Sequence, residues 1–147
     1  MGAVVTARGY TVAGFVRDHA PSRLVAIRGP EDVAEVCRGL RRSQREVFVV
    51  LLLNARHEMM RRITVSVGSL NASIVHPREV FKPAILASAA SVVLVHNHPS
   101  GDPQASDEDL TITRRLVQAG EILGISVLDH IVVARRGITS LRASGAM

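Results

Sequence analysis

One stretch of fourteen residues, His96 to Asp109, limits what this chain can fold into more than any other part of it. It follows the apolar run Ser91–Val95 and precedes Leu110–Leu123, which has the apolar periodicity of a helix. The two prolines and the glycine between these runs exclude both strand and helix and require a turn. The sequence therefore predicts a buried strand, a turn and a helix, in that order.

Residues from both ends of this stretch can meet at one metal ion. His96 and His98 are two positions apart, so on a strand both point to the same face, with Cβ atoms roughly 6–7 Å apart. Asp109 shares a helical stripe with Ile112 and Leu116, and a carboxylate that faces inward needs a partner. Two histidines and one aspartate leave a fourth position for water, which is typical of catalytic zinc sites. The same ligands also suit other divalent metals.

Two simpler interpretations stay open for these residues. Ser106 and Asp109 have the spacing of a helix-capping motif, which needs no metal and is compatible with one. The histidines of an isolated His-x-His sequence are more often exposed loop residues than metal ligands. The whole series of strand, His-x-His-Pro, turn and Ser-x-x-Asp is much more specific than any of its parts.

Composition indicates one domain with a substantial core, because the chain has 147 residues, 47% of them hydrophobic. No apolar run approaches the length of a membrane span, and the N-terminus lacks a signal-peptide pattern. The single cysteine, Cys37, excludes an internal disulfide and fits a reducing compartment. Its helical context favours a packed residue over a nucleophile. We therefore expect a cytoplasmic protein without a membrane partner.

The net charge of +5 comes from arginine, since Lys82 is the only lysine among the 18 basic residues. Such an excess favours anionic partners. The arginines form two clusters, one of Arg38, Arg41, Arg42 and Arg45 and one of Arg56, Arg61 and Arg62. Recognition of single-stranded nucleic acid usually needs exposed aromatic side chains, and the chain has only one Tyr and three Phe. Weak, non-specific nucleic-acid binding is therefore expected at most.

The rest of the pattern predicts an α/β fold in which helices flank a mixed central sheet. The continuous run Val47–Leu53 is typical of a strand covered on both faces and is the best candidate for the sheet centre. The other expected strands are Tyr10–Val16 at an edge, Leu24–Ile27, Ile63–Val67, Val92–Val95, Ile125–Val133 and Ile138–Leu141. The expected helices are Glu31–Leu40, Pro77–Ala90 with a kink or late start at Pro83, and Ser106–Leu123 closed by Gly124; a loop is expected at Gly68–Ala72.

Several of these segments resemble one known family. The spacing His-x-His, seven residues, Ser, two residues, Asp resembles the JAMM motif of JAB/MPN metalloproteases. The segments that resemble the RadC family more closely are His96–Asp109, Leu128–Val133, Gly68–Asn71 and His76–Glu79. Asn97 replaces the Ser or Thr usual in eukaryotic JAMM enzymes, as in RadC, whereas Ala105 stands where RadC relatives usually have Pro. The resemblance covers roughly Glu31–Arg142.

This resemblance implies the JAB/MPN, or cytidine deaminase-like, architecture for residues 31–147, with residues 1–30 as an N-terminal arm and edge strand. Nothing in the first thirty residues resembles the helix-hairpin-helix region that RadC proteins commonly carry. The DNA-binding role attached to that region therefore has no support in this sequence.

The resemblance also implies roles for individual residues. A zinc ion would be held by His96, His98 and Asp109. Glu46, just before the central strand, matches the catalytic glutamate, and Ser106 matches a serine associated with stabilising the oxyanion. Apart from the resemblance, Asp129 could orient a ligand histidine from outside the site, since the non-ligating nitrogen of such a histidine is usually held by a carboxylate or carbonyl. The alternative for Asp129 and its neighbour His130 is a structural polar pair bonded to the backbone.

Two functions are therefore expected, and a third is rejected. The first is a zinc-dependent metallohydrolase that cleaves peptide or isopeptide bonds of a peptide or protein substrate with a metal-activated water. The second is a non-catalytic metal-containing binding module, in line with the description of RadC proteins as DNA repair proteins. An HNH-type nuclease is rejected, because that name describes dispersed residues and His96-Asn97-His98 is a contiguous tripeptide at the end of a strand.

Overall fold

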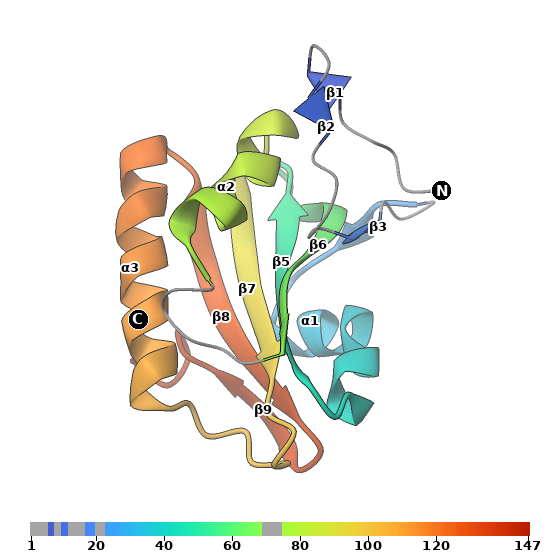
Figure 1. The fold of residues 1–147 in the computed structure, drawn as a ribbon, viewed down its shortest axis with the longest axis vertical. Helices are drawn as coiled ribbons and strands as arrows, with labels where there is room; N and C mark the ends of the chain where they lie inside the picture. The colour runs from blue at the N-terminus through green and yellow to red at the C-terminus, as the bar shows by residue number, and fades with distance from the viewer. Residues whose placement is uncertain (1–5, 8–9, 12–16, 20–22, 69–74) are drawn as a thin grey trace.

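The computed structural model describes residues 6–7, 10–11, 17–19, 23–68 and 75–147 (Figure 1). The strands are β1 (Thr6–Ala7), β2 (Tyr10–Thr11), β3 (Arg17–His19), β4 (Val25–Ala26), β5 (Glu46–Leu53), β6 (Glu58–Gly68), β7 (Ser91–Asn97), β8 (Ser126–Ala134) and β9 (Gly137–Ser140). The helices are α1 (Pro30–Val36), the short 3₁₀ helix η1 (Arg38–Arg42), α2 (Pro77–Leu86) and α3 (Asp107–Leu123).

A seven-stranded mixed sheet forms the centre of the fold. Six strands follow the order β3-β6-β5-β7-β8-β9, and β4 also pairs with β6. Neighbouring strands are antiparallel except β7 and β8, which are parallel and joined by the crossover helix α3. The predicted mixed α/β fold is confirmed, and the run Val47–Leu53 lies in the centre of the sheet as expected.

Helices cover both faces of this sheet, with α2 and α3 on one side and α1 with η1 on the other (Figure 1). Side chains of β5 alternate between the two cores, because successive residues of a strand point to opposite faces. The α2/α3 core receives Phe48, Val50 and Leu52, and the α1 core receives Val49, Leu51 and Leu53. A continuous apolar run is thus needed at this position.

Near its C-terminal end, helix α3 packs tightly against α2 and against the chain that leads into β8. A Cβ at Gly120 would be 2.4 Å from the carbonyl oxygen of Ile125 and 3.2 Å from the ring of Phe81, so only glycine fits there. The helix ends at Gly124, whose φ of 71° is left-handed, as the sequence predicts. No helix among the described residues is long and apolar enough to cross a membrane.

Other elements differ in extent from the sequence prediction. The helix expected at Glu31–Leu40 leaves α-helical geometry at Cys37 and continues as η1, which contains the weak helix former Gly39. Strand β6 is longer than predicted because it pairs with all of β5 and also with β3 and β4. Helix α2 starts at Pro77, passes through Pro83 and stops one turn later instead of reaching Ala90.

The predicted edge strand is described only at Tyr10–Thr11, and its residues 12–16 lie outside the described residues. Residues 69–72 of the predicted loop also lie outside them. The short strands β3 and β4, both before residue 31, pair with β6 in the main sheet. The division of the chain at residue 30 stays a prediction.

Candidate metal centre

Strand β7 and helix α3 bring three metal-binding side chains together. His96 lies in β7 and is fully buried, His98 follows the strand, and Asp109 lies in the first turn of α3 with 3% of its surface exposed. The Nε2 atoms of the two histidines are 2.9 Å apart. Asp109 Oδ1 is 3.1 Å from His96 Nε2, and Asp109 Oδ2 is 3.1 Å from His98 Nε2. The three residues thus form one group that could hold a metal ion.

The bonding of His98 tests whether this group fits a cation. His98 Nδ1 lies 2.8 Å from the carbonyl oxygen of Asp102, which can only accept, so Nδ1 carries the proton. In the neutral ring, Nε2 then presents a lone pair toward the other two residues. A lone pair and a carboxylate at this distance repel each other unless a cation or a proton lies between them. The donor set therefore fits a divalent cation.

Electrostatics at the site point the same way. Hydrogen bonding to Asp109 is the main cause of a raised pKa of His98, and the nearby carboxylate of Glu46 adds to it. Burial alone would raise the pKa of Asp109, but the hydrogen bonds of His96 and His98, the charge that His96 carries when protonated and the hydrogen bond from the Ser106 amide outweigh it and hold this pKa far below its ordinary value. Asp109 is therefore ionised at any ordinary pH and attracts positive charge.

The first turn of α3 fixes the position of the Asp109 carboxylate. Ser106 Oγ accepts a hydrogen bond from the Asp109 amide at 3.1 Å, and the Ser106 amide donates to Asp109 Oδ2 at 2.7 Å. This is the capping box expected from the Ser-x-x-Asp spacing. The capping and metal interpretations of Asp109 are compatible, since Oδ1 takes no part in the cap.

Glu46 begins β5 on the same face of the sheet. Phe48 pairs with His96 across β5 and β7, and the two rings stack with centroids 6.2 Å apart. Continued by two residues beyond this pair, the antiparallel register would place Glu46 opposite His98. Its effect on the pKa of His98 agrees with that position. Glu46 therefore lies near the metal-binding group, as the family resemblance implies.

Asn97 points to the opposite face and holds the segment that leads to Glu46. Its Oδ1 accepts from the amide of Val47 at 2.7 Å, and its Nδ2 donates to the carbonyl of Arg45 at 2.9 Å. A longer contact of 3.4 Å reaches the carbonyl of Ser43. Asn97 is 1% exposed. One buried amide thus ties the start of β5 to the end of β7.

A β-bulge in β8 decides which polar residue approaches the site from the next strand. Val92 of β7 pairs with Val127 of β8. Val93 pairs with Asp129, which leaves Leu128 as an extra residue of β8. Because one extra residue shifts the alternation, Asp129 faces the α1 side together with Val93.

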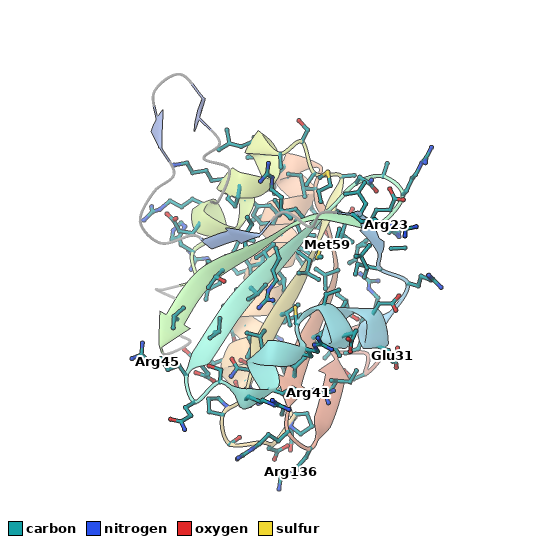
Figure 2. All side chains as sticks on the ribbon, turned by 90° about the vertical axis from the view of Figure 1, so that its right-hand side faces the viewer. Arg23, Glu31, Arg41, Arg45, Met59 and Arg136 are labelled. Carbon is teal, nitrogen blue, oxygen red and sulfur yellow. The ribbon has the colours of Figure 1, made fainter. Side chains whose placement is uncertain are left out.

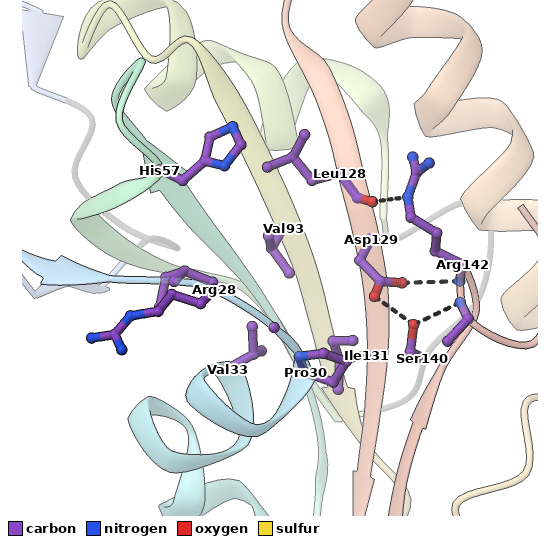
Figure 3. Close-up of a pocket in the computed structure, with 13 residues that line it drawn as sticks. Arg28, Pro30, Val33, His57, Val93, Leu128, Asp129, Ile131, Ser140 and Arg142 are labelled. Atoms are coloured by element: carbon purple, nitrogen blue, oxygen red, sulfur yellow. Dashed lines mark hydrogen bonds between the residues drawn. The ribbon is translucent and has the colours of Figure 1, made fainter.

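Asp129 therefore does not contact His96 or His98, which corrects its expected role as a support for a ligand. Its carboxylate accepts from the amide of His130 at 2.7 Å. It also accepts from Ser140 Oγ at 2.5 Å and from the amide of Arg142 at 3.0 Å (Figure 3). Asp129 also lines a cavity of about 300 Å³ on the α1 face, shared with Val33, Val93 and Ile131 among others. The alternative of a structural polar pair bonded to the backbone holds for Asp129, whereas the ring of His130 contacts His96 and Thr113 instead.

His130, and not Asp129, contacts the nitrogen of His96 that faces away from the metal-binding group. Its Nε2 lies 2.7 Å from His96 Nδ1, and its Nδ1 lies 2.5 Å from Thr113 Oγ1. Burial lowers the pKa of His130 well below its ordinary value, and the charge of His96 lowers it further. Thr113 was not among the site residues predicted from the sequence. The only signal for it is its place four residues after Asp109, on the same face of α3.

A family model described as a RadC-like JAB domain matches residues 27–146. The chain belongs to the RadC-like JAB domain family. The UPF0758 protein of Desulforamulus reducens is 56% identical over 122 residues, which make up 82% of this chain and 54% of that protein. A UPF0758 protein of Shouchella clausii is 54% identical over 120 residues, 81% of this chain and 52% of the relative.

A UPF0758 protein of Bacillus cereus is 50% identical over 121 residues, again 82% of this chain and 54% of the relative. The RadC resemblance of the sequence is thus confirmed. This RadC-like chain spans about half the length of the relatives it matches. Residues 27–146 are thus a RadC-like JAB domain that contains a His-His-Asp group able to hold a metal ion.

Proposed function

We propose that this RadC-like JAB domain is a zinc-dependent hydrolase that cleaves peptide or isopeptide bonds. The observation that supports it is the convergence of His96, His98 and Asp109, with donor atoms 2.9–3.1 Å apart, on the face where Glu46 begins β5. Two imidazoles and one carboxylate leave a coordination position open, which is how catalytic zinc sites differ from structural ones. Other divalent metals would accept the same ligands, so zinc is part of the proposal.

The proposed reaction uses this chain's residues in distinct roles. A divalent ion held by His96, His98 and Asp109 supplies Lewis acidity, which polarises a carbonyl and makes a water more acidic. The oxygen of the attacking water bonds to the carbonyl carbon, and Glu46 accepts the proton that this water loses. Glu46 then delivers that proton to the leaving nitrogen as the carbon–nitrogen bond breaks.

Ser106 has a second role in this proposal. Its oxygen accepts the hydrogen bond of the helix cap, which leaves the hydroxyl proton to donate to a substrate oxygen. The residue is exposed at the N-terminus of α3, where the helix dipole also favours negative charge. We therefore assign to Ser106 the stabilisation of the oxyanion that develops on the substrate.

The experiment that tests the proposal is Glu46→Gln. Glutamine keeps the size of the side chain but cannot take a proton from water, and the substitution leaves the three ligand side chains unchanged. Turnover on a panel of peptide and isopeptide substrates should fall by about 10²–10⁴-fold, as expected for loss of a general base. Zinc content and melting temperature should stay close to those of the wild type.

Glu121→Gln is the matched control, because Glu121 is exposed at the far end of α3. It makes the same chemical change and should leave turnover unchanged. A Glu46→Gln protein as active as the wild type would remove Glu46 from the mechanism. Zinc-loaded wild-type protein that cleaves neither peptide nor isopeptide bonds would favour the non-catalytic binding module instead.

The position of the arginines supports an anionic partner as a second candidate. Figure 2 shows Arg41, Arg45 and Arg136 at one end of the molecule. Arg45 precedes β5, and Arg136 pairs with Asp102 at 3.6 Å in the loop that follows β7, so this end carries the proposed site. We propose that any nucleic-acid binding there is electrostatic and sequence-independent. Affinity should then fall steeply as salt rises, and a strong preference for one sequence at physiological salt would contradict it.

A further inference from the structure

Two buried polar side chains behind the metal-binding group have no role in the proposed reaction. Thr113 in α3 is 1% exposed, and His130 in β8 is fully buried. Their side-chain hydrogen bonds among the described residues do not involve the atoms that His98 and Asp109 would offer to a metal ion, His98 Nε2 and the Asp109 carboxylate. Both belong to one series of short hydrogen bonds that starts at the backbone of Asp109 and ends at the ring of His96. The direction of each bond in this series follows from its chemistry.

The direction is fixed at the carbonyl oxygen of Asp109. This oxygen lies 2.6 Å from Thr113 Oγ1, and because a carbonyl can only accept, the hydroxyl must donate its single proton there. Thr113 Oγ1 can then only accept from the ring of His130, 2.5 Å away. The Nδ1 of His130 therefore carries a proton.

The other nitrogen of His130 determines the state of His96. A doubly protonated His130 would place a charge in a fully buried position, without a carboxylate in contact with its ring, so the ring is neutral and its Nε2 accepts. His96 Nδ1, 2.7 Å away, must therefore donate to it. The proton of His96 then sits on the side away from the metal-binding group, and its Nε2 lone pair faces His98 and Asp109.

The opposite arrangement would block the site. If Thr113 did not accept from His130, the proton of His130 could move to Nε2, where it would meet the Nδ1 proton of His96. His96 would then have to carry its proton on Nε2. A protonated Nε2 cannot bind a metal ion, although the fold and all three ligand side chains would be in place.

We propose that Thr113 and His130 are positioning residues that hold His96 in the tautomer able to bind metal. The proposal rests on the proposed metal site, but it concerns two residues that would not touch the ion. In this proposal the backbone carbonyl of Asp109 sets the direction of every hydrogen bond in the series. Asp109 thereby also determines the tautomer of His96, the neighbouring ligand. Ring contacts with Phe48 support the arrangement, because Phe48 stacks on His96 and meets His130 edge-on at 5.5 Å.

The test compares metal affinity in two threonine variants of α3. Thr113→Val keeps the shape of the side chain and removes its hydroxyl. Thr111→Val is the matched control, because Thr111 Oγ1 also donates to the carbonyl four residues earlier, that of Asp107 at 2.9 Å, on the exposed face of the helix. Affinity for Co²⁺ is measured by competition with a chromophoric chelator on the metal-free chain of 147 residues.

Thr113→Val should weaken Co²⁺ binding by roughly 10–100-fold, the usual effect of losing a residue that supports a metal ligand. Thr111→Val should bind as the wild type does, and Thr113→Ser, which restores the hydroxyl, should recover the affinity. Equal affinities of Thr113→Val and Thr111→Val would overturn the proposal. A purely structural role of Thr113 would lower the melting temperature without changing the affinity of the folded protein.

A second measurement needs no metal and separates this proposal from the proposed function. Long-range ¹H–¹⁵N spectra of the metal-free wild type should show His96 protonated at Nδ1 and His130 protonated at Nδ1. In Thr113→Val, His96 should shift to the Nε2-protonated form. A wild-type His96 protonated at Nε2 would overturn the positioning role. The correct tautomer in a protein that binds no metal would support the hydrogen-bond series and count against the metal site instead.

Discussion

The two faces of the central sheet hold their buried and half-buried polar side chains in different ways. On the α1 face, Asn97 bonds to main-chain groups before and within β5, and Asp129 bonds to two amides and to Ser140. These hydrogen bonds use the polar atoms of each side chain and do not continue toward a group that lacks a partner. On the α2/α3 face, Thr113, His130 and His96 bond to one another, and the series ends in lone pairs that face a carboxylate.

This difference separates polar side chains that stabilise the fold from polar side chains that could bind an ion. A polar group bonded to backbone has every partner it needs and stabilises the fold. A group whose lone pairs converge on other lone pairs needs something further, a proton or a metal ion. The same two strands supply both arrangements, because Asn97 lies between His96 and His98 on β7, and Asp129 precedes His130 on β8. Burial alone would not distinguish the two faces.

The largest expected effect concerns metal content. Metal analysis of the wild type should give about one zinc per chain, and His96→Ala/His98→Ala should bind none. Asp129→Ala removes a half-buried carboxylate on the α1 side of the sheet. This variant should bind as much zinc as the wild type. Equal metal content in the wild type and the double variant would mean that the α2/α3 face holds no ion, and the comparison of the two faces would fail.

A smaller effect is expected at Asn97, which serves the site from the opposite face. Asn97→Ala leaves the Val47 amide and the Arg45 carbonyl without this partner, which should cost about 1–3 kcal/mol in the free energy of unfolding. Zinc content should not change, whereas turnover should fall because Glu46 loses its support. Denaturant unfolding, metal analysis and turnover measure the three quantities.

Asn54→Ala is the control for Asn97→Ala. Asn54 accepts from the amides of Arg56 and Glu58 at the other end of β5, so its loss should also destabilise the protein. It should leave turnover unchanged. If both variants lower turnover equally, Asn97 has no specific effect on Glu46.

The next effect is on stability alone. Asp129→Asn exchanges a carboxylate oxygen for an amide that cannot accept, and it should lower the free energy of unfolding by about 1–3 kcal/mol. Its zinc affinity should equal that of the wild type, because the β8 bulge turns this side chain away from His96. A lowered zinc affinity in the folded Asp129→Asn protein would restore the role that the sequence suggested for Asp129.

The smallest effect concerns the cost in stability of ionising the Cys37 thiol, which is buried on the α1 face. Burial raises the pKa of the Cys37 thiol to about 11 from an ordinary 9.0. A raised folded-state pKa means that its contribution to stability is complete below pH 9 and is lost as the pH rises from 9 toward 11. At pH 10 the loss should be about 1 kcal/mol. It should be absent from Cys37→Ala, and an identical pH dependence in both proteins would contradict the burial argument.

Sequence reasoning succeeded where one local pattern determines the structure. The continuous apolar run at Val47–Leu53 and the spacing of His96, His98 and Asp109 needed only the two-residue period of strands and the capping of a helix. It failed at Asp129, because a bulge shifts alternation and depends on how β8 meets β7. It missed Thr113, because a threonine in a helix gains meaning only from the histidine that the fold places beside it.

The bulge at Leu128 also divides strand β8 into two parts with different constraints. Before it, the chain leaves α3 through the tight contact of Gly120 with Ile125, so the helix dictates where the strand begins. After it, residues 129–133 run in step with β7, residue by residue. The extra residue therefore separates the part of β8 whose position α3 determines from the part, including His130, whose position the register with β7 determines.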